Sequence, residues 1–405
     1  MRIPSYTTVG GTFSDTSQLR NALTALEIVN PKTNAPFTEA MLLGIGGGLH
    51  FTYFIFEYEA TATLVLHGRY EDIKQGALFA ELVCSRLGIP ATRKETSGVK
   101  AAQRHLREAL EQNRPALIWV DQAALPYHNL PVELERTFYH AITACGFEDS
   151  EVLIDDLAPK PWRMDWEERN EARNAIQYVN NRLLSIGRPE GSLRVRSGIV
   201  LGLKQCMANL SDQEVSNFGL EGIQHWESLL DDTDEKSRWN KIFNSPERQY
   251  NALRDLYKYI RVGGNKGGSG LLRGMFADFL MEAAPILEES ELENIATKYR
   301  RLEFSWNTLA DTALPDALGY LSSTRKLLDE QHKLLSETGG EAMERLREIS
   351  DKLWNMEIDA DEHVANDGPL FAHLFNDIRD QLKSLYLQER SALEDLHEVV
   401  RGLRA

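Results

Sequence analysis

The chain has 405 residues, of which 42% are hydrophobic and 26% are charged, an ordinary composition that excludes a largely disordered protein. A chain of this length exceeds what one hydrophobic core usually serves, so we expect two domains. The formal net charge of −16 would repel a phosphate backbone, which excludes nucleic acid as an expected partner.

The sequence also favours a cytoplasmic protein without a membrane segment or a metal. Its longest apolar runs, such as Ala116–Val120, have the length of strands rather than of membrane spans. The first residues contain no apolar segment typical of a secretory signal. Cys84, Cys145 and Cys206 lie far apart, and the histidines show no paired spacing. We therefore expect free thiols and no metal site.

In chain order, the first predicted element is a helix that begins near Ser14 and ends before Asn30, with apolar residues at helical spacing. Segments with similar spacing predict further helices, and segments rich in β-branched and aromatic residues predict strands. The predicted helices are Thr38–Leu43, Ile73–Leu87 and Val99–Gln112, and the predicted strands are Phe51–Tyr58, Thr63–His67 and Ala116–Asp121.

A hairpin follows, in which Phe138–Cys145 and Glu151–Asp155 flank a turn. Helices followed by a run of strands are typical of the α+β class. After Pro161 nearly every apolar pattern is helical, so we expect domains over residues 1–162 and 163–405, the second one all-α. Its predicted helices include Ala175–Leu184, Gly198–Met207, Leu271–Leu287 and Leu292–Leu309.

Ser14 is the first candidate for chemistry. It stands at the expected start of a helix, after the flexible pair Gly10-Gly11. Unpaired backbone N–H groups at a helix N-terminus stabilise negative charge, as a nucleophile and an oxyanion require. Serine is also a common helix cap, and position alone favours that simpler interpretation.

His140 and the neighbouring pair Asp155 and Asp156 form a second candidate group. His140 opens the first strand of the predicted hairpin, and the two aspartates end the second. A hairpin brings these positions together, so a histidine–aspartate hydrogen bond is expected. The Ser14 hydroxyl needs such a base to become nucleophilic. Taken singly, these residues are better explained as a structural histidine and as aspartates of a turn or helix cap.

Several blocks together resemble the family of butirosin biosynthesis protein H. The blocks are Gly10–Asn21, Thr38–Leu49, Asp121 with Leu125–Tyr127, His140–Phe147 with Val152–Asp156, and in the second half Asn217–Ile223 and Gly270–Ala284. Their order and spacing follow the family's N-terminal domain and the helical domain that commonly comes after it.

The resemblance implies a papain-like fold in the N-terminal domain and a nucleophile–His–Asp apparatus. That apparatus would move an acyl group from an acyl carrier protein thioester to a small-molecule amine, forming an amide in secondary-metabolite biosynthesis. The carrier protein would bring the phosphopantetheine, so no cofactor is expected in this chain. By position the nucleophile is Ser14, the base His140, and the orienting acid Asp156, with Asp155 as second choice.

Two departures leave the chemistry open. Phe13-Ser14 stands where the family has His-Cys, and Tyr139 replaces a glycine before His140. Ser14 could act through an ester, His140 could assist direct attack by the amine, or the site could be inactive or carry an engineered Cys→Ser change. A thioesterase or peptidase and a non-catalytic binding protein remain alternatives, and a homo-oligomer through the helical domain is left open.

Overall fold

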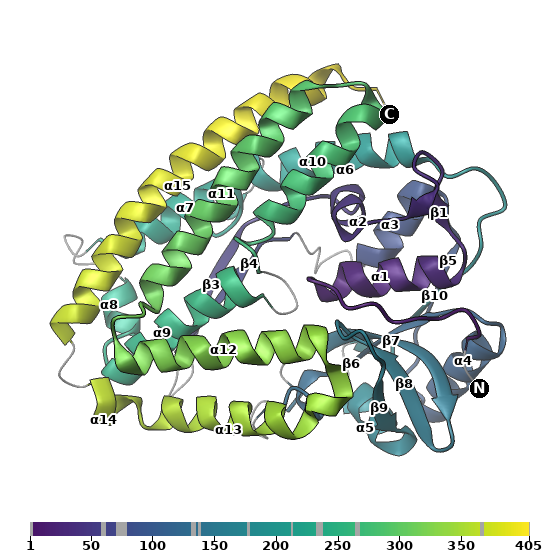
Figure 1. Cartoon of the computed structure of the whole chain (residues 1–405), viewed down its shortest axis with the longest axis horizontal. Coiled ribbons are helices and arrows are strands. Elements are labelled where there is room, and N and C mark those ends of the chain that lie inside the picture. Colours follow the sequence, from purple (N-terminus) through teal and green to yellow (C-terminus); the bar gives the residue numbers. More distant parts are fainter. Residues whose placement is uncertain are drawn as a thin grey trace. The chain divides into compact units, whose positions relative to one another are not determined.

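The computed structural model describes residues 3–57, 62–69, 79–130, 135–136, 139–175, 179–211, 214–231, 238–263, 268–364 and 368–404. The chain forms two compact units (Figure 1). Unit 1 comprises Met1–Leu42, Ile73–Val195 and Gln331–Asp351, and unit 2 comprises Leu43–Asp72, Arg196–Glu330 and Lys352–Ala405. The segments of the two units alternate along the sequence. The expected domains over residues 1–162 and 163–405 stay a prediction.

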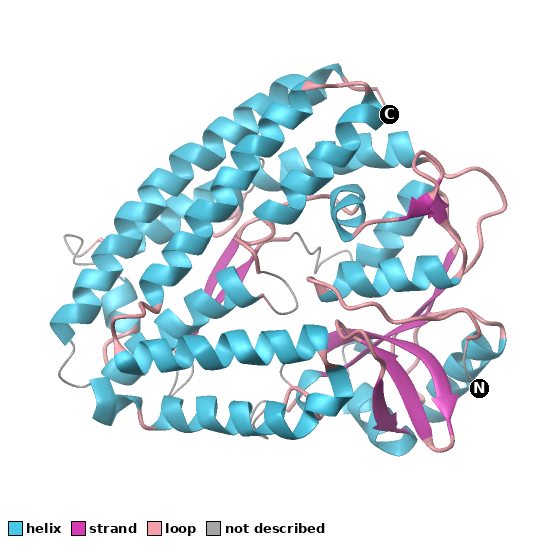
Figure 2. Ribbon diagram, viewed as in Figure 1, coloured by secondary structure: helices cyan, strands magenta, loops and turns pink. Residues whose placement is uncertain are grey.

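Unit 1 is built on a six-stranded antiparallel sheet with the strand order β5-β10-β6-β7-β8-β9, drawn in magenta in Figure 2. Its strands are β5 (Ala91–Lys94), β6 (Ala116–Asp121), β7 (Tyr139–Glu148), β8 (Glu151–Asp155), β9 (Trp162–Asp165) and β10 (Leu183–Ile186). Every residue of the central strand β6 is buried, which explains its continuous apolar sequence. Strand β6 pairs Val120 with His140 on β7 and thereby fixes where the histidine lies.

Helices complete unit 1. They include α1 (Ser14–Ala25), α3 (Phe79–Leu87), α4 (Val99–Glu111) and α5 (Trp166–Ala175), while α2 (Glu39–Ile45) begins in this unit. Helix α1 packs against β7 and buries Leu19, Ala22 and Leu23. A small ribbon of β1 (Val29–Asn30) and β2 (Ala35–Pro36) follows α1. The packing of α1 on β7 brings the start of α1 toward the strand that carries His140.

Unit 2 is mainly helical, with long helices packed side by side. Helix α11 (Glu291–Ala313) contacts both α10 (Arg273–Leu287) and α15 (Gly368–Gly402), as Figure 1 shows. A two-stranded sheet of β3 (Thr52–Glu57) and β4 (Ala62–His67) also belongs to this unit. The other helical segments of the chain's second half are α6 (Val195–Ser211), α7 (Gly219–Leu229), α8 (Arg238–Ile242), α9 (Pro246–Tyr257), α12 (Gly319–Glu337), α13 (Met343–Ile358) and α14 (Ala360–Val364), with short turns at Lys258–Val262 and Gly339–Ala342.

The α+β class, the helix beginning at Ser14 and the β7–β8 hairpin are confirmed. The expectation that the chain is all-α after residue 162 is wrong, as is the predicted helix Ala175–Leu184. Strand β10 occupies Leu183–Ile186, and all four of its residues are buried between β5 and β6. Four apolar-rich residues are too few to distinguish a helical period from a strand, and pairing with two neighbours decides the outcome. The papain-like fold stays a prediction.

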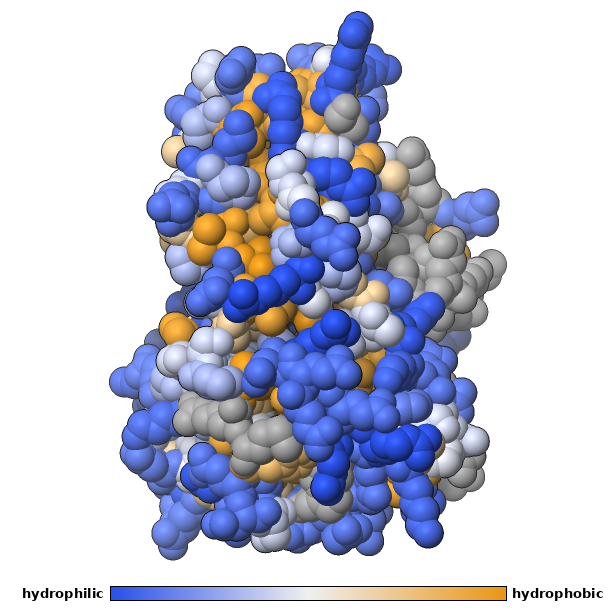
Figure 3. All heavy atoms as spheres, turned by 90° about the vertical axis from the view of Figure 1, so that its right-hand side faces the viewer, coloured by the Kyte–Doolittle hydropathy of each residue, from blue (hydrophilic) through white to orange (hydrophobic). Residues whose placement is uncertain are grey.

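Other predicted elements extend beyond the residues that the structure describes. Residues 73–78 of the predicted helix Ile73–Leu87 lie outside the described residues, as do the strand-end positions Tyr58 and Phe138. Among the helices that are described, none is long and apolar enough to cross a membrane. Hydrophilic side chains cover most of the face in Figure 3, as expected for a strongly acidic chain.

Candidate active site

The predicted nucleophile Ser14 is the first residue of α1 and is completely buried. The two glycines before it are required by close packing. A side chain at Gly11 would place its Cβ 2.2 Å from the Cβ of Ser17, and one at Gly10 would lie 2.6 Å from the carbonyl oxygen of Ser336. The Gly11 N–H also donates to the Leu157 carbonyl at 3.0 Å. The close packing of the segment before α1 therefore requires glycine at positions 10 and 11.

Glu39 anchors the same entry. Its carboxylate accepts the backbone N–H groups of Thr12 and Phe13, both at 3.1 Å, and the Thr16 hydroxyl at 2.7 Å. Arg20 pairs with this carboxylate at 3.2 Å. A carboxylate at a helix start satisfies donors that the helix itself leaves unpaired and interacts favourably with the helix dipole. Glu39 thus fixes the first turn of α1, on which Ser14 lies.

Asp156 is the centre of the site. Its Oδ1 accepts the Ser14 hydroxyl at 2.7 Å and the Gln18 side-chain amide at 3.3 Å. Its Oδ2 lies 2.7 Å from Nε2 of His140 and accepts the Tyr127 hydroxyl at 2.9 Å. The structure therefore brings Ser14, His140 and Asp156 together, with the carboxylate between the hydroxyl and the imidazole. The Ser14 proton points to Asp156 in this arrangement.

Aromatic side chains surround this carboxylate. The Tyr127 ring stacks on Trp162 at 4.1 Å between centroids, and the Trp162 indole N–H donates to the Asp156 carbonyl at 2.9 Å. The His128 ring meets the His140 ring edge to face at 5.4 Å. Such packing excludes water and holds the imidazole in one orientation.

The electrostatics determine the protonation of the pair. Burial would raise the pKa of the Asp156 carboxyl, but the charge and hydrogen bond of His140, the charge of His128 and the Ser14 hydrogen bond hold it below its usual value. Asp156 is therefore an acceptor at neutral pH, and the Nε2 nitrogen of His140 that faces it carries a proton. The other ring nitrogen, Nδ1, is then the basic one.

Asp155, the second choice for the orienting acid, faces a different set of partners. Its Oδ2 accepts the Tyr6 hydroxyl at 2.6 Å and the Asn21 amide at 3.0 Å. Burial raises the pKa of Asp155 to about 7, and the neighbouring Asp156 charge also raises it. The hydrogen bonds from Tyr6 and Asn21 act in the opposite direction and lower it. The structure thus places Asp156, not Asp155, in contact with Ser14 and His140.

Sequence reasoning missed Gln18, one helical turn after Ser14. Its amide nitrogen lies 2.7 Å from the Ser14 oxygen, and the buried Thr143 hydroxyl donates to its amide oxygen at 3.0 Å. The i,i+4 spacing from Ser14 was the available signal, because it puts both side chains on one helix face.

A segment far along the chain also belongs to unit 1. Gln331–Asp351 includes the end of α12 and the start of α13, which Figure 1 shows joined by a short turn. The Asn129 amide donates to Asp351 at 3.0 Å, next to His128. Gly339 lies against Ala158 in the loop after Asp156. This segment supports the loops on either side of the site, a role no local pattern in the sequence indicates.

His128, His140 and Asp156 could in principle hold a metal, since one ligand atom from each lies within 4.8 Å of the others. Two imidazoles and a carboxylate are a donor set that zinc accepts. A metal would have to displace the proton shared by His140 and Asp156. The Asp156 oxygens already accept four hydrogen bonds, so the arrangement is complete as an acid–base site without an ion.

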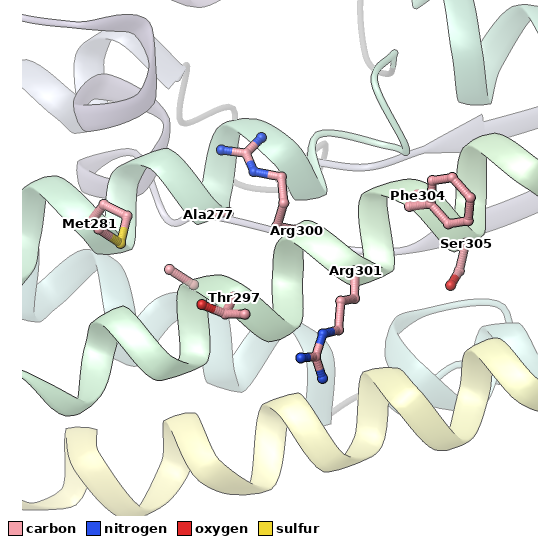
Figure 4. Close-up of a pocket in the computed structure, with 8 residues that line it drawn as sticks. Ala277, Met281, Thr297, Arg300, Arg301, Phe304 and Ser305 are labelled. Carbon is pink, nitrogen blue, oxygen red and sulfur yellow. The ribbon is translucent and has the colours of Figure 1, made fainter.

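A groove on unit 2 contains none of these residues. It has a volume of about 430 Å³ and is lined along α10 and α11 by Ala277, Met281, Ala296, Thr297, Arg300, Arg301, Phe304 and Ser305 (Figure 4). Arg300 already pairs with Glu303 at 2.8 Å and also with Asp278. Its charge is therefore compensated by the protein itself, and the groove offers no assembled ligand site.

Two family models match successive parts of the chain. Residues 15–157 match the family described as butirosin biosynthesis protein H, N-terminal, and residues 168–320 match a domain of unknown function, DUF4872. The chain belongs to the butirosin biosynthesis protein H-like family. The family suggests an enzyme of biosynthesis. No curated protein is significantly similar to the chain.

The matched ranges also show where the candidate residues stand relative to the family model. His140 and Asp156 lie inside the butirosin biosynthesis protein H range, whereas Ser14 directly precedes its first residue. The segment Gln331–Asp351, which supports the site loops, lies beyond the end of the DUF4872 range. His140 and Asp156 therefore lie in the part that matches the family model, whereas Ser14 lies just outside it.

Proposed function

We propose that the chain is an amide-forming acyltransferase that takes an acyl group from an acyl carrier protein thioester and delivers it to a small-molecule amine, with Ser14 as the nucleophile. One observation carries this proposal. Ser14 and His140 both bond to the Asp156 carboxylate, at 2.7 Å each, at the start of a helix in a buried site. Nucleophilic catalysis requires such a hydroxyl, base and orienting acid in one place.

The proposed mechanism follows from the His140 tautomer. With its Nε2 proton directed to Asp156, the imidazole takes the Ser14 proton on Nδ1 after the hydroxyl turns away from the carboxylate. The Ser14 oxygen attacks the thioester carbonyl, and the carrier's thiol leaves with the proton from His140. The amine then attacks the serine ester and forms the amide, and the Ser14 hydroxyl is regenerated.

Two features favour transfer without a further cofactor. A thioester is a higher-energy acyl donor than an ester or an amide, so both steps run downhill without ATP or a metal. The carrier protein supplies the phosphopantetheine, and nothing in this mechanism requires a cofactor in the chain itself. The buried site limits access of water, which would otherwise hydrolyse the ester and turn the enzyme into a thioesterase.

A second candidate mechanism is favoured by one specific observation. The Ser14 hydroxyl donates its proton to Asp156, not to His140, and its oxygen accepts from Gln18. In this alternative His140 deprotonates the amine, which attacks the thioester directly, and no serine ester forms.

The experiment that tests the proposal measures intact protein mass after incubation with an acylated carrier protein or with an acyl-N-acetylcysteamine thioester. We expect an acyl adduct on the wild-type protein that is absent from Ser14→Ala. Ser17→Ala is the matched control and should keep the adduct, because among the described residues this buried hydroxyl donates to the Ser14 carbonyl, at 3.1 Å, and not to the Ser14 side chain. Ser14→Cys should form the adduct faster, since a thiol is the stronger nucleophile.

The products distinguish the alternatives. Amide formation that persists in Ser14→Ala without any adduct supports direct attack. Free acid released at the same rate with and without an amine identifies a hydrolase. Turnover confined to Ser14→Cys shows that serine stands in place of the working nucleophile. Absence of adduct and product in every variant rejects acyl transfer and favours a binding protein.

A further inference from the structure

We propose that Gln18 is a positioning residue whose side-chain amide orients the Ser14 oxygen and donates a hydrogen bond to the negative charge that develops on it. The assignment rests on the proposed function, in which Ser14 loses its proton.

The orientation of the amide is fixed by its neighbours. The Gln18 amide nitrogen lies 2.8 Å from the carbonyl oxygen of Ala141, which can only accept a hydrogen bond. The NH₂ end must therefore face Ala141, and the amide oxygen faces the Thr143 hydroxyl at 3.0 Å. A flipped amide would set two acceptors against each other. Gln18 consequently presents a donor, not an acceptor, to Ser14 at 2.7 Å.

Gln18 connects the helix that carries Ser14 to the strand that carries His140. Gln18 lies on α1 with Ser14. Its two partners on β7, Ala141 and Thr143, both follow His140 within three residues along the strand. The side chain is almost fully buried, so it holds one conformation. It fixes the distance between the helix that carries the hydroxyl and the strand that carries the base.

The chemistry requires a donor at this point. One Gln18 N–H bonds to Ala141, and the other is directed at the Ser14 oxygen. When Ser14 loses its proton, the adjacent Asp156 carboxylate repels the new charge, and the Gln18 N–H stabilises it. The backbone N–H groups of Thr12 and Phe13, at the same helix start, are engaged by Glu39.

The test uses Ser14→Cys as a reporter, because a thiolate absorbs near 240 nm and reacts with iodoacetamide whereas a thiol does not. Position 14 is as buried as the natural cysteines, so the reporter is separated from them by its peptide mass. Cys84, Cys145 and Cys206 are all buried, and burial raises the pKa of Cys84 and of Cys206 to about 12. Peptide mass analysis assigns the alkylation to position 14, and its rate against pH gives the pKa of the introduced thiol.

The decisive comparison is Ser14→Cys with Ser14→Cys/Gln18→Met, in which methionine keeps the length of glutamine and removes the donor. We expect the pKa of the introduced thiol to rise by about one unit in the double variant. At a pH below the pKa values of both variants, this lowers the thiolate fraction about tenfold. An unchanged pKa in a folded protein would overturn the proposal, since a purely structural glutamine would not alter ionisation.

A second pair of variants covers the case in which Gln18→Met does not fold. Thr143→Val keeps the shape of the buried side chain and removes the donor that fixes the Gln18 amide, whereas Thr143→Ser keeps the hydroxyl. In the Ser14→Cys background we expect a smaller rise in the pKa with valine and none with serine. Equal values in the two variants would contradict the assignment.

The readout is made on the free protein and so separates this inference from the proposed function. A thiol pKa that depends on Gln18 in a protein without acyl-transfer activity would refute the proposed function and support the positioning role. Acyl transfer through Ser14 together with a pKa independent of Gln18 would refute the positioning role and leave the proposed function standing.

Discussion

Each unit buries a group of charges, and the two groups differ in whether a proton can move. In unit 2, Arg273 and Glu389 form an ion pair at 2.7 Å with both side chains at 0% exposure. The Trp306 indole donates to the same carboxylate at 2.8 Å. In unit 1, the buried Asp156 bonds instead to His140 and Ser14. An arginine keeps its charge throughout the physiological pH range, whereas a histidine exchanges its proton there.

The comparison shows that buried charge alone does not indicate catalysis. The Arg273–Glu389 pair joins α10 to α15, and Arg273 further donates to the His50 and Leu271 carbonyls. These are features of a structural pair. The Asp156 group has a titratable base and a hydroxyl at a helix start, which a structural pair does not need. We therefore expect substitutions in unit 2 to change stability, and those at the Asp156 group to change chemistry.

The largest expected effect on stability is that of Arg273→Met. It leaves Glu389 charged and buried without its cation, which typically costs about 3–5 kcal/mol. Urea unfolding followed by circular dichroism measures the loss. Arg300→Met is the matched control, because this arginine on α11 is half-exposed and pairs with Glu303 at the surface. Its loss should cost about 1 kcal/mol or less.

The double variant Arg273→Met/Glu389→Met completes this test. Removing both charges leaves no unpaired ion and should recover most of the stability lost in Arg273→Met. If Arg273→Met unfolds with the same urea midpoint as the wild-type protein, the pair is not structural and the contrast between the units fails.

The sequence predicted the site better than it predicted the surroundings of the site. Ser14, His140 and Asp156 could be found because each stands at the end of a local element, where a single helix start or hairpin fixes its place. The residue pattern alone does not distinguish Asp155 from Asp156, and the preference for Asp156 came from the family resemblance. Adjacent residues point in opposite directions, so packing decides which one meets His140.

Contacts between segments far apart in the sequence could not be predicted from local sequence patterns. Strand β10 is recognisable only through its pairing with β5 and β6, and Gln331–Asp351 joins unit 1 from a distant part of the sequence. The role of Gln18 depends on hydrogen bonds to β7 that no spacing along α1 reveals. The fold class follows from local patterns, whereas such contacts between distant segments follow from tertiary packing.

The next largest effect is a dependence of stability on pH caused by Asp155. Its pKa is raised to about 7 from an ordinary value of 3.8, so the folded protein binds a proton that the unfolded chain releases. The free energy of unfolding should therefore fall as the pH rises from about 4 to about 7, by on the order of 3 kcal/mol. Asp155→Asn should flatten this decline in a series of urea midpoints.

Asp156 supplies the control, because its shift has the opposite sign. Its pKa is held below the ordinary value, so its contribution to stability is present above about pH 4 and is lost on further acidification. Asp156→Asn should leave most of the decline between pH 4 and 7 in place, because burial is the main cause of the Asp155 shift and the Asp156 charge only adds to it. The same variant should abolish acyl transfer. A decline that persists unchanged in Asp155→Asn would show that another group causes it.

The smallest effect comes from Gly11→Ala, which disturbs the entry to α1 without altering a charge. Its new Cβ would lie 2.2 Å from the Cβ of Ser17, so the first turn must shift, at a cost of about 1–3 kcal/mol. Gly191→Ala is the matched control, because no atom lies within 4 Å of its added Cβ. If Ser14 is the nucleophile, Gly11→Ala should reduce adduct formation more than its loss of stability explains, as measured under conditions where the variant is fully folded. Equal adduct formation in the two glycine variants would mean that the geometry at Ser14 does not limit the reaction, and the contrast between a structural and a chemical charge group would then rest on His140 and Asp156 alone.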